Sequence, residues 1–190
     1  MLICAVNGSP HTNGNTAFLL NNILDNLKSR GADTEFLNIG KIMSNLEKPF
    51  CVCCKSPCDA SCFKNTELWD AFELLIKADF IIFASPVYFG TMSAQLKAFF
   101  DKTRFFRGQR AFEGKFGTAI SVGASKYGGQ GTTLRAIQDC MFVQGMNIVG
   151  NFSQDLPGHQ GLCAQAPASE DENAIRYCSA VADRIMEICK

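Results

Sequence analysis

Apolar and polar positions divide this chain into two alternating kinds of segment. Five runs that are continuously apolar or alternate with period two, each followed by a turn signal, predict β-strands at residues 2–7, 34–39, 79–85, 114–123 and 146–152. The runs LICAVN at 2–7 and DFIIFAS at 79–85 are apolar almost throughout. Such runs are typical of strands that are covered on both faces of a sheet.

The segments between these runs carry apolar residues at helical spacing. They predict α-helices at residues 15–31, 67–78, 93–106, 132–145 and 170–190. Regular alternation of strand and helix predicts right-handed parallel crossovers, and therefore an α/β fold with a doubly wound five-stranded parallel sheet and helices on both faces. The length of 190 residues suits one sizeable core, so we expect residues 1–190 to form a single domain, with 157–169 as a long loop.

Composition and charge narrow the possible partners. Lysine and arginine number 18 and are balanced by 18 acidic residues, so no broad field favours nucleic acid or a membrane surface. The apolar start of the chain is shorter than a signal-peptide core, and no run reaches the length of a membrane span. We therefore expect a cytoplasmic protein whose thiols stay reduced, which makes disulfides the least favoured explanation of its cysteines.

The segment after the first predicted strand has the composition of a phosphate site. NGSPHTNGNT at 7–16 supplies glycines, hydroxyls and amides, and leads directly into a helix whose first N–H groups and positive dipole end attract phosphate. It matches neither a Walker loop nor a G-x-G-x-x-G turn, which disfavours a nucleoside triphosphate or a nicotinamide site of the Rossmann type. The alternative is a capped helix start with Asn13 or Asn15 as N-cap.

Two later segments suit a flat ring. SPVYFGTMSAQLKAFFDK at 85–102 places a proline, two aromatic residues and a glycine directly after the third strand, and VGASKYGGQGTT at 122–133 places four glycines and a tyrosine after the fourth. Ligands of such sheets bind beyond the carboxyl ends of the strands. One loop for a phosphate and two for a planar ring together indicate a pocket for flavin mononucleotide (FMN).

The same three segments resemble those of the NADPH-dependent FMN reductase and iron-sulfur flavoprotein families, from residue 2 to about 150. The resemblance implies the flavodoxin-like strand order 2-1-3-4-5 and a homodimer or homotetramer with the flavin near a subunit interface. By this resemblance the FMN phosphate is held by Ser9, His11, Thr12, Asn13, Gly14, Asn15 and Thr16. The ring is lined by Pro86, Val87, Tyr88, Phe89 and Gly90, and covered by Gly123, Ala124, Ser125, Tyr127, Gly128 and Gly129. His11 departs from the family, which often has arginine or lysine there.

Five cysteines fall within CVCCKSPCDASC at 51–62. Iron-sulfur flavoproteins carry a compact cysteine motif at this place in the chain, so the resemblance implies a [4Fe–4S] cluster with Cys51, Cys54, Cys58 and Cys62 as ligands. The spacing differs from that motif, and Cys53 is an additional thiol. Zinc and a metal-free reduced loop are the competing hypotheses. We expect the other five cysteines to fill the core, with the position of Cys163 the least determined.

These features predict an FMN-dependent NAD(P)H oxidoreductase of the flavin or quinone reductase type. The acceptor would be a small flavin or quinone, or a redox protein. The alternative is a flavin and iron-sulfur electron carrier without NAD(P)H turnover, although carriers are usually acidic and this chain is neutral. A third possibility, a module that uses the fold without FMN, requires the three loops to be coincidental. Because the flavin performs the chemistry, we name no catalytic side chain. Four basic residues follow one another at the end of the predicted helix 93–106 and in the loop after it: Lys102, Arg104, Arg107 and Arg110. They could meet the 2′-phosphate of NADPH, and the alternative is that they only complement the C-terminus of that helix.

Overall fold

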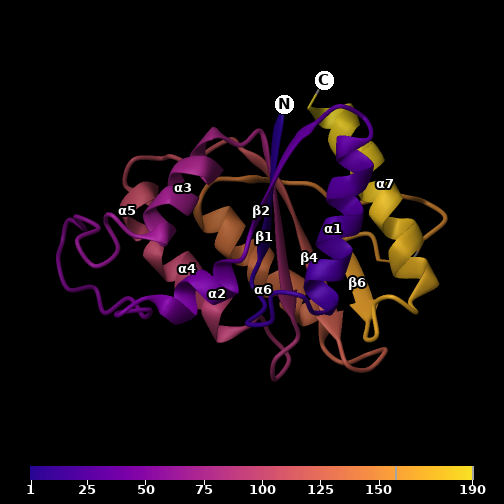
Figure 1. Ribbon diagram of the computed structural model, residues 1–190, viewed down its shortest axis with the longest axis horizontal. Coiled ribbons are helices and arrows are strands. Elements are labelled where there is room, and N and C mark those ends of the chain that lie inside the picture. The colour runs from indigo at the N-terminus through magenta and orange to yellow at the C-terminus, as the bar shows by residue number, and fades with distance from the viewer. Residues whose placement is uncertain (157, 190) are drawn as a thin grey trace.

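A computed structural model describes residues 1–156 and 158–189 of the protein. Its central layer is a parallel sheet with helices packed on both faces (Figure 1). The strands run in the order β2-β1-β3-β4-β5, and a further strand, β6, also pairs with β4. They are β1 (Leu2–Asn7), β2 (Asp33–Leu37), β3 (Phe80–Pro86), β4 (Phe116–Gly123), β5 (Asn147–Ile148) and β6 (Leu162–Gln165). The flavodoxin-like order 2-1-3-4-5 is confirmed.

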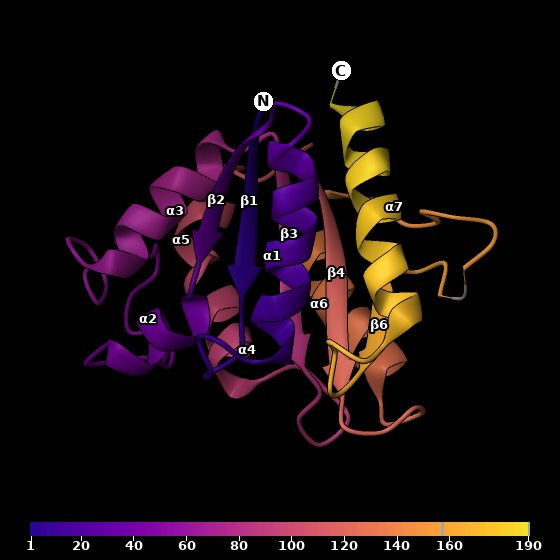
Figure 2. The ribbon, with the colours of Figure 1, turned by 45° about the vertical axis from the view of Figure 1, so that its right-hand side comes forward.

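The helices divide between the two faces of the sheet (Figure 2). One face is covered by α1 (Asn15–Lys28) and α7 (Glu172–Ile188), which pack against each other. The other carries α2 (Ile39–Asn45), α3 (Glu67–Lys77), α4 (Ala94–Lys102), α5 (Arg104–Arg107) and α6 (Gln130–Val143). Among the described residues, no helix has the length and apolar character needed to cross a lipid bilayer.

The core lies on both sides of the sheet, because alternate residues of each strand point to opposite faces. In β1, Ile3 and Ala5 join the cluster under α1 and α7, whereas Cys4 and Val6 join the cluster under the other helices. Cys4 and Cys178 are fully buried, and this burial raises the pKa of each thiol to about 12. Cys4 and Cys178 are therefore core residues, as predicted. Of the other three cysteines outside the cysteine-rich segment, Cys140 and Cys189 are half-buried and Cys163 is exposed.

The fifth position of the sheet differs from the prediction. A strand was expected at 146–152, but β5 covers only Asn147–Ile148 and pairs with the first two residues of β4. The second half of β4 pairs with β6, which forms inside the predicted loop at 157–169. The apolar run at 146–152 continues past the point where the chain leaves the sheet, and the four residues of β6 are too few to give a recognisable period.

The helix prediction also changes in two places. The helix expected at 93–106 is divided into α4 and α5 at Thr103, and α2 was not predicted because its seven residues carry a weak pattern. Residues 157 and 190, which the predicted loop and last helix include, lie outside the described residues.

Candidate cofactor site and cysteine loop

Three loops follow β1, β3 and β4 at one end of the sheet. We call them the first loop (residues 8–14), the second loop (87–93) and the third loop (124–129). Because these strands are adjacent and parallel, the loops lie together at the carboxyl end of the sheet, the lower end in Figure 2. The three segments that the sequence singled out therefore converge on one region of the molecule.

The first loop is shaped by buried polar side chains. The Asn7 Oδ1 accepts a hydrogen bond from the Ser9 N–H at 3.1 Å, and the Ser9 Oγ accepts one from the His11 N–H at 3.1 Å. Asn7 Nδ2 donates to the Asn38 Oδ1 at 3.1 Å, which ties the loop to the segment before α2. Asn7 and Ser9 are buried, whereas the His11 side chain is exposed. The loop is thus held in place independently of any ligand.

The start of α1 has no side-chain cap. Its N-cap is Gly14, no side chain accepts a hydrogen bond there, and no acidic residue lies in the first turn. The Oδ1 of Asn15 instead accepts a hydrogen bond from the Ala168 N–H at 2.8 Å. The capping alternative is therefore wrong, and the first N–H groups of this 14-residue helix remain available to an anion. Of the proposed phosphate residues, Thr16 is buried, and Thr12 and Asn13 lie at least partly exposed beside the helix start.

Two residues that the sequence did not single out fix the first loop. A Cβ atom at Gly40 of α2 would stand 2.0 Å from the Ser9 carbonyl oxygen, so only glycine permits this approach. The buried Ser93 Oγ donates to the Gly8 carbonyl at 2.6 Å and accepts from the Leu96 N–H at 3.2 Å. The Ser-x-x-Leu start of α4 could have identified Ser93 as a helix cap, but not its contact with Gly8.

The second and third loops pack directly against each other. A Cβ atom at Gly129, whose φ is +101°, would lie 3.0 Å from the Gly90 Cα and 3.2 Å from the Val87 Cγ1. The Thr132 Oγ1 donates to the Gly90 carbonyl at 2.6 Å. The structure thus brings together the two loops that were predicted to line and cover the ring.

The contact surface of these loops is aromatic and carries free backbone donors. Phe89 and Tyr127 are almost fully exposed, and Tyr88 is partly exposed. In the second loop the Val87 N–H donates to the Val122 carbonyl, and the backbones of Tyr88 and Thr91 exchange two N–H···O=C hydrogen bonds. Among the described residues, the N–H groups of Phe89 and Gly90 have no acceptor, so they can donate to the edge of a bound ring.

A hollow of about 930 Å³ adjoins the third loop on the side of β6. Tyr127, Gly129 and Cys163 are among the residues that line it. The Cys163 Sγ lies 3.8 Å from the Ser121 Oγ. Although the residue as a whole is exposed, partial desolvation of its sulfur raises the pKa of the thiol. Cys163 is therefore not a core filler, and its raised pKa opposes a role as a nucleophilic thiolate.

The cysteine loop, residues 51–62, projects from the helical layer between α2 and α3 (Figure 1). Of its twelve residues only Ala60 is buried, and all five cysteines are exposed or half-buried. Thiols suit an iron-sulfur cluster or zinc by type. Within the described residues, however, no three potential ligands lie close enough together to hold a metal ion. The loop therefore has the donors of a metal site without a preassembled cage.

A buried lysine anchors the end of this loop. The Lys102 Nζ donates to the Lys48 carbonyl at 2.6 Å and lies 3.2 Å from the Cys62 Sγ. It is 2% exposed and has no carboxylate within ion-pair distance among the described residues. A buried ammonium without a carboxylate is costly, and its hydrogen bonds to the Lys48 carbonyl and the Cys62 sulfur offset part of that cost.

The basic residues assigned to a 2′-phosphate lie elsewhere. Arg104, Arg107 and Arg110 border a cleft that includes Glu113 and Gly145, which precede the first residues of β4 and β5. This is the amino end of the sheet, opposite the three loops. Lys102 is buried against the cysteine loop. The structure therefore places these residues away from the three loops, and their contact with the 2′-phosphate of NADPH stays a prediction.

Comparisons with known proteins agree with this geometry. The model of the family described as NADPH-dependent FMN reductase matches residues 1–155. An iron-sulfur flavoprotein of Methanosarcina thermophila is 34% identical over 99% of this chain and 95% of its own length. An NAD(P)H dehydrogenase (quinone) of Archaeoglobus fulgidus is 32% identical over 72% of this chain and 70% of its own length.

Solved structures show the same fold at lower identity. An NADH:FMN oxidoreductase in its apo form superposes with a TM-score of 0.70 at 21% identity, covering 98% of this chain and 88% of its own. A flavodoxin, WrbA-like protein from Agrobacterium tumefaciens superposes with a TM-score of 0.66 at 19% identity, and the match covers 98% of each chain. The three loops converge at one end of the sheet, and the strand order is the one expected for this fold. Because the family model also matches residues 1–155, the chain belongs to the NADPH-dependent FMN reductase family.

Proposed function

We propose that this protein is an FMN-dependent NAD(P)H oxidoreductase of the flavin or quinone reductase type. The observation that carries the proposal is the contact of the second and third loops, where Gly129 approaches Gly90 and Thr132 bonds its carbonyl. That contact forms one aromatic surface with two free N–H donors beside an uncapped helix start. Relatives named NAD(P)H dehydrogenase (quinone) support the same class of reaction.

In this proposal the first loop and α1 bind the phosphate, through backbone N–H groups together with Ser9 and the residues from His11 to Thr16. Tyr88, Phe89 and Tyr127 cover the ring, and the N–H groups of Phe89 and Gly90 donate to its edge. FMN when bound supplies hydride and single-electron transfer, and the chain orients it and tunes its electrostatics. The exposed Phe89 and Tyr127 support the further proposal that two copies of the chain meet near the flavin.

The cysteine loop extends the proposal to a metal centre. Cys51, Cys54, Cys58 and Cys62 would hold a [4Fe–4S] cluster, which would supply single-electron transfer to a partner protein. The relatives named iron-sulfur flavoprotein support this assignment. Because the donors are not assembled in the described structure, the loop would draw together as the cluster binds. Iron and sulfide at the stoichiometry of the cluster would support it, whereas zinc or no metal would contradict it.

Anaerobic titration with NADPH tests the reductase. Purified protein reconstituted with FMN is mixed with NADPH, and the flavin absorbance is followed. Bleaching within seconds is the expected result. A flavin that is bound but reduced only when a protein donor is added would favour the electron carrier, and failure to bind FMN would contradict both.

A pair of glycine variants tests the loop contact itself. Gly129→Ala and Gly31→Ala both force a side chain into a positive-φ conformation, but only Gly129 faces the second loop. Apart from Gly31 itself and its two chain neighbours, no described residue has an atom within 4 Å of a Cβ at this position. We expect Gly129→Ala to weaken FMN binding about tenfold or more relative to Gly31→Ala, equivalent to about 1.4 kcal/mol. Equal affinities would contradict the proposed role of this contact.

A further inference from the structure

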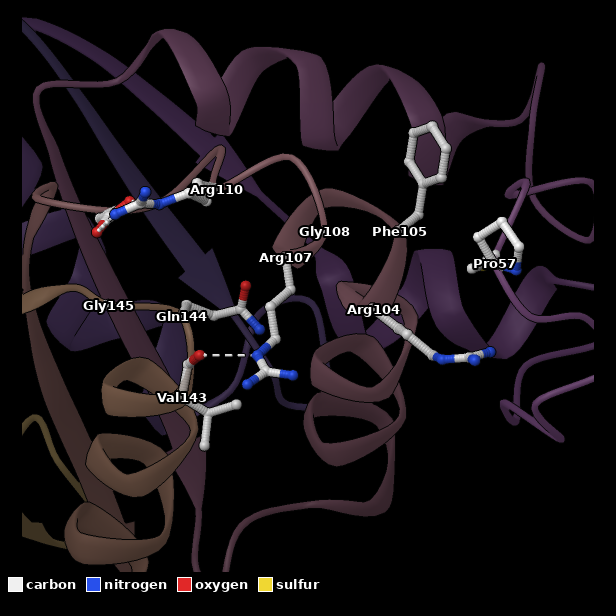
Figure 3. A pocket seen from close by; sticks show the side chains of 11 residues that line it. Pro57, Arg104, Phe105, Arg107, Gly108, Arg110, Val143, Gln144 and Gly145 are labelled. Carbon is white, nitrogen blue, oxygen red and sulfur yellow. Dashed lines mark hydrogen bonds and ion pairs between the residues drawn. The ribbon is translucent and has the colours of Figure 1, made fainter.

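A cleft of about 500 Å³ lies at the amino end of the sheet, beside the cysteine loop (Figure 3). Its walls come from α5 and the turn after it, from the end of α6, and from Pro57 and Cys58 of the cysteine loop. The three loops of the flavin site lie at the opposite end of the strands. The cleft is therefore a second cavity that the proposed flavin chemistry does not use.

The cleft holds two uncompensated positive charges. Arg110 forms an ion pair with Glu113, and in Figure 3 the Arg110 side chain points away from the side chains of Arg104 and Arg107. Among the described residues, Arg104 and Arg107 have no carboxylate within ion-pair distance. A cavity wall with two unpaired guanidinium groups attracts an oxyanion.

Both guanidinium groups are held in fixed positions. The Arg104 Nη1 donates to the Lys55 carbonyl at 2.8 Å, and the Arg107 Nε donates to the Val143 carbonyl at 3.1 Å. A guanidinium has five N–H donors, so each arginine keeps several after its backbone bond. Arg104 thereby joins α5 to the cysteine loop, and Arg107 joins α5 to the last carbonyl of α6.

The rest of the lining is partly apolar. The Phe105 ring is half-buried and is held by the Trp69 ring, with centroids 5.8 Å apart. Val143 is 58% exposed, and Pro57 forms the far wall. An inorganic ion would leave these surfaces in water, whereas an organic acid would cover them. The volume lies within the range of about 300–1,000 Å³ that is typical of small-molecule sites.

We propose that this cleft binds an aromatic carboxylate, with Arg104 and Arg107 at the carboxylate and Phe105 and Val143 against the ring. Arginine matches a carboxylate through parallel N–H donors, which gives orientation as well as affinity. The site is distinct from the flavin site, and its ligand is recognised by charge and shape. The proposal does not depend on FMN binding, and it applies to the metal-free cysteine loop, because Cys58 in the cleft wall is also a proposed cluster ligand.

Binding of 2-naphthoate to the FMN-loaded protein tests the proposal. Titration calorimetry gives the dissociation constant, and the ¹⁵N signal of the Arg107 Nε–H reports the location. We expect Arg107→Gln to weaken binding about tenfold or more, and Arg135→Gln, which removes an exposed arginine paired with Asp139, to leave it unchanged. The neutral analogue 2-naphthalenemethanol should bind far more weakly than the acid.

Val143→Glu provides a second variant that is expected to fold, because this side chain is exposed. It places a negative charge beside Arg107 and should abolish binding of the acid. Equal binding to the wild-type protein and both variants would overturn the proposal. So would a site that takes inorganic phosphate as tightly as 2-naphthoate, or one that binds only an acidic protein. Flavin reduction by NADPH, measured on the same samples, should be unchanged by Arg107→Gln, so failure of one proposal is distinguishable from failure of the other.

Discussion

The first, second and third loops are held by the rest of the chain in a different way from the cysteine loop. The first three are fixed by buried hydroxyl and amide groups and by glycines that admit close backbone contact, as at Ser93 and Gly40. The cysteine loop has one buried residue, Ala60, and leaves the apolar Val52 78% exposed. The first, second and third loops are therefore preorganised by packing, whereas few buried contacts hold the cysteine loop.

The largest expected effect comes from adding one methyl group beneath the first loop. Gly40→Ala places a Cβ against the Ser9 carbonyl, and overpacking of this kind costs about 1–3 kcal/mol. We expect FMN binding to weaken about a hundredfold if the whole cost falls on the loop. Fluorescence of free FMN gives the affinity, and thermal unfolding shows whether the fold survives.

Gly108→Ala is the matched control for this variant, because its Cβ would meet only one atom, at 3.5 Å. A Gly40→Ala protein with unchanged FMN affinity would mean that the first loop does not hold the phosphate in the observed conformation.

Removal of the Ser93 hydroxyl should have a smaller effect on the same region. Ser93→Ala leaves the Gly8 carbonyl and the Leu96 N–H without their partner, at a cost of about 1–3 kcal/mol. We expect a lower free energy of unfolding and FMN binding weakened about tenfold. Ser29→Ala removes an exposed hydroxyl that donates to the Asn26 carbonyl and should change neither quantity.

Lys102→Met should affect the cysteine loop and leave the first, second and third loops intact. The variant loses the bonds to the Lys48 carbonyl and the Cys62 sulfur, and methionine fills much of the same volume. If the attached conformation of the cysteine loop loses about 1 kcal/mol of stability, the population of the locally opened loop rises about fivefold. We expect trypsin to cleave at Lys55 about five times faster at unchanged FMN affinity.

Lys97→Met, on the same helix, removes an exposed pair with Asp101 and serves as the control for Lys102→Met. If the Lys102→Met protein binds FMN more slowly but is not cleaved faster, then Lys102 supports the first, second and third loops and not the cysteine loop, which contradicts the prediction.

The smallest expected effect is at the exposed Lys55–Asp59 pair. Lys55, together with hydrogen bonds from Ser61, holds the pKa of the Asp59 carboxyl below its ordinary range, but both side chains are exposed. Exposed pairs contribute little to stability. Lys55→Ala should leave the unfolding midpoint and the FMN affinity within error of the wild type. A clear drop in the midpoint would show that the cysteine loop is more tightly organised than its burial indicates.

The sequence predicts those parts of the molecule whose signals are local. Apolar runs identify β1 and β3, and turn composition identifies the first, second and third loops. Gly40 and Ser93 escaped prediction because their roles depend on contacts with residues 31 and 85 positions away, at Ser9 and Gly8. The position of Arg104 and Arg107 could not be predicted for the same reason, since residue spacing in α5 does not reveal at which end of the sheet this helix lies. Cys163 was uncertain in the sequence because β6 is too short to be recognised.

The division of the fifth sheet position between β5 and β6 has a consequence for association between chains. A long, continuous outer strand offers a row of free peptide groups on which another chain can build a strand. Here that border consists of segments of two and four residues, so neither gives an incoming strand enough consecutive partners. Directly after β5, the Val149 carbonyl accepts a hydrogen bond from the Thr118 hydroxyl at 2.9 Å, so this backbone acceptor is already occupied. This border is thereby protected from fibril-like growth.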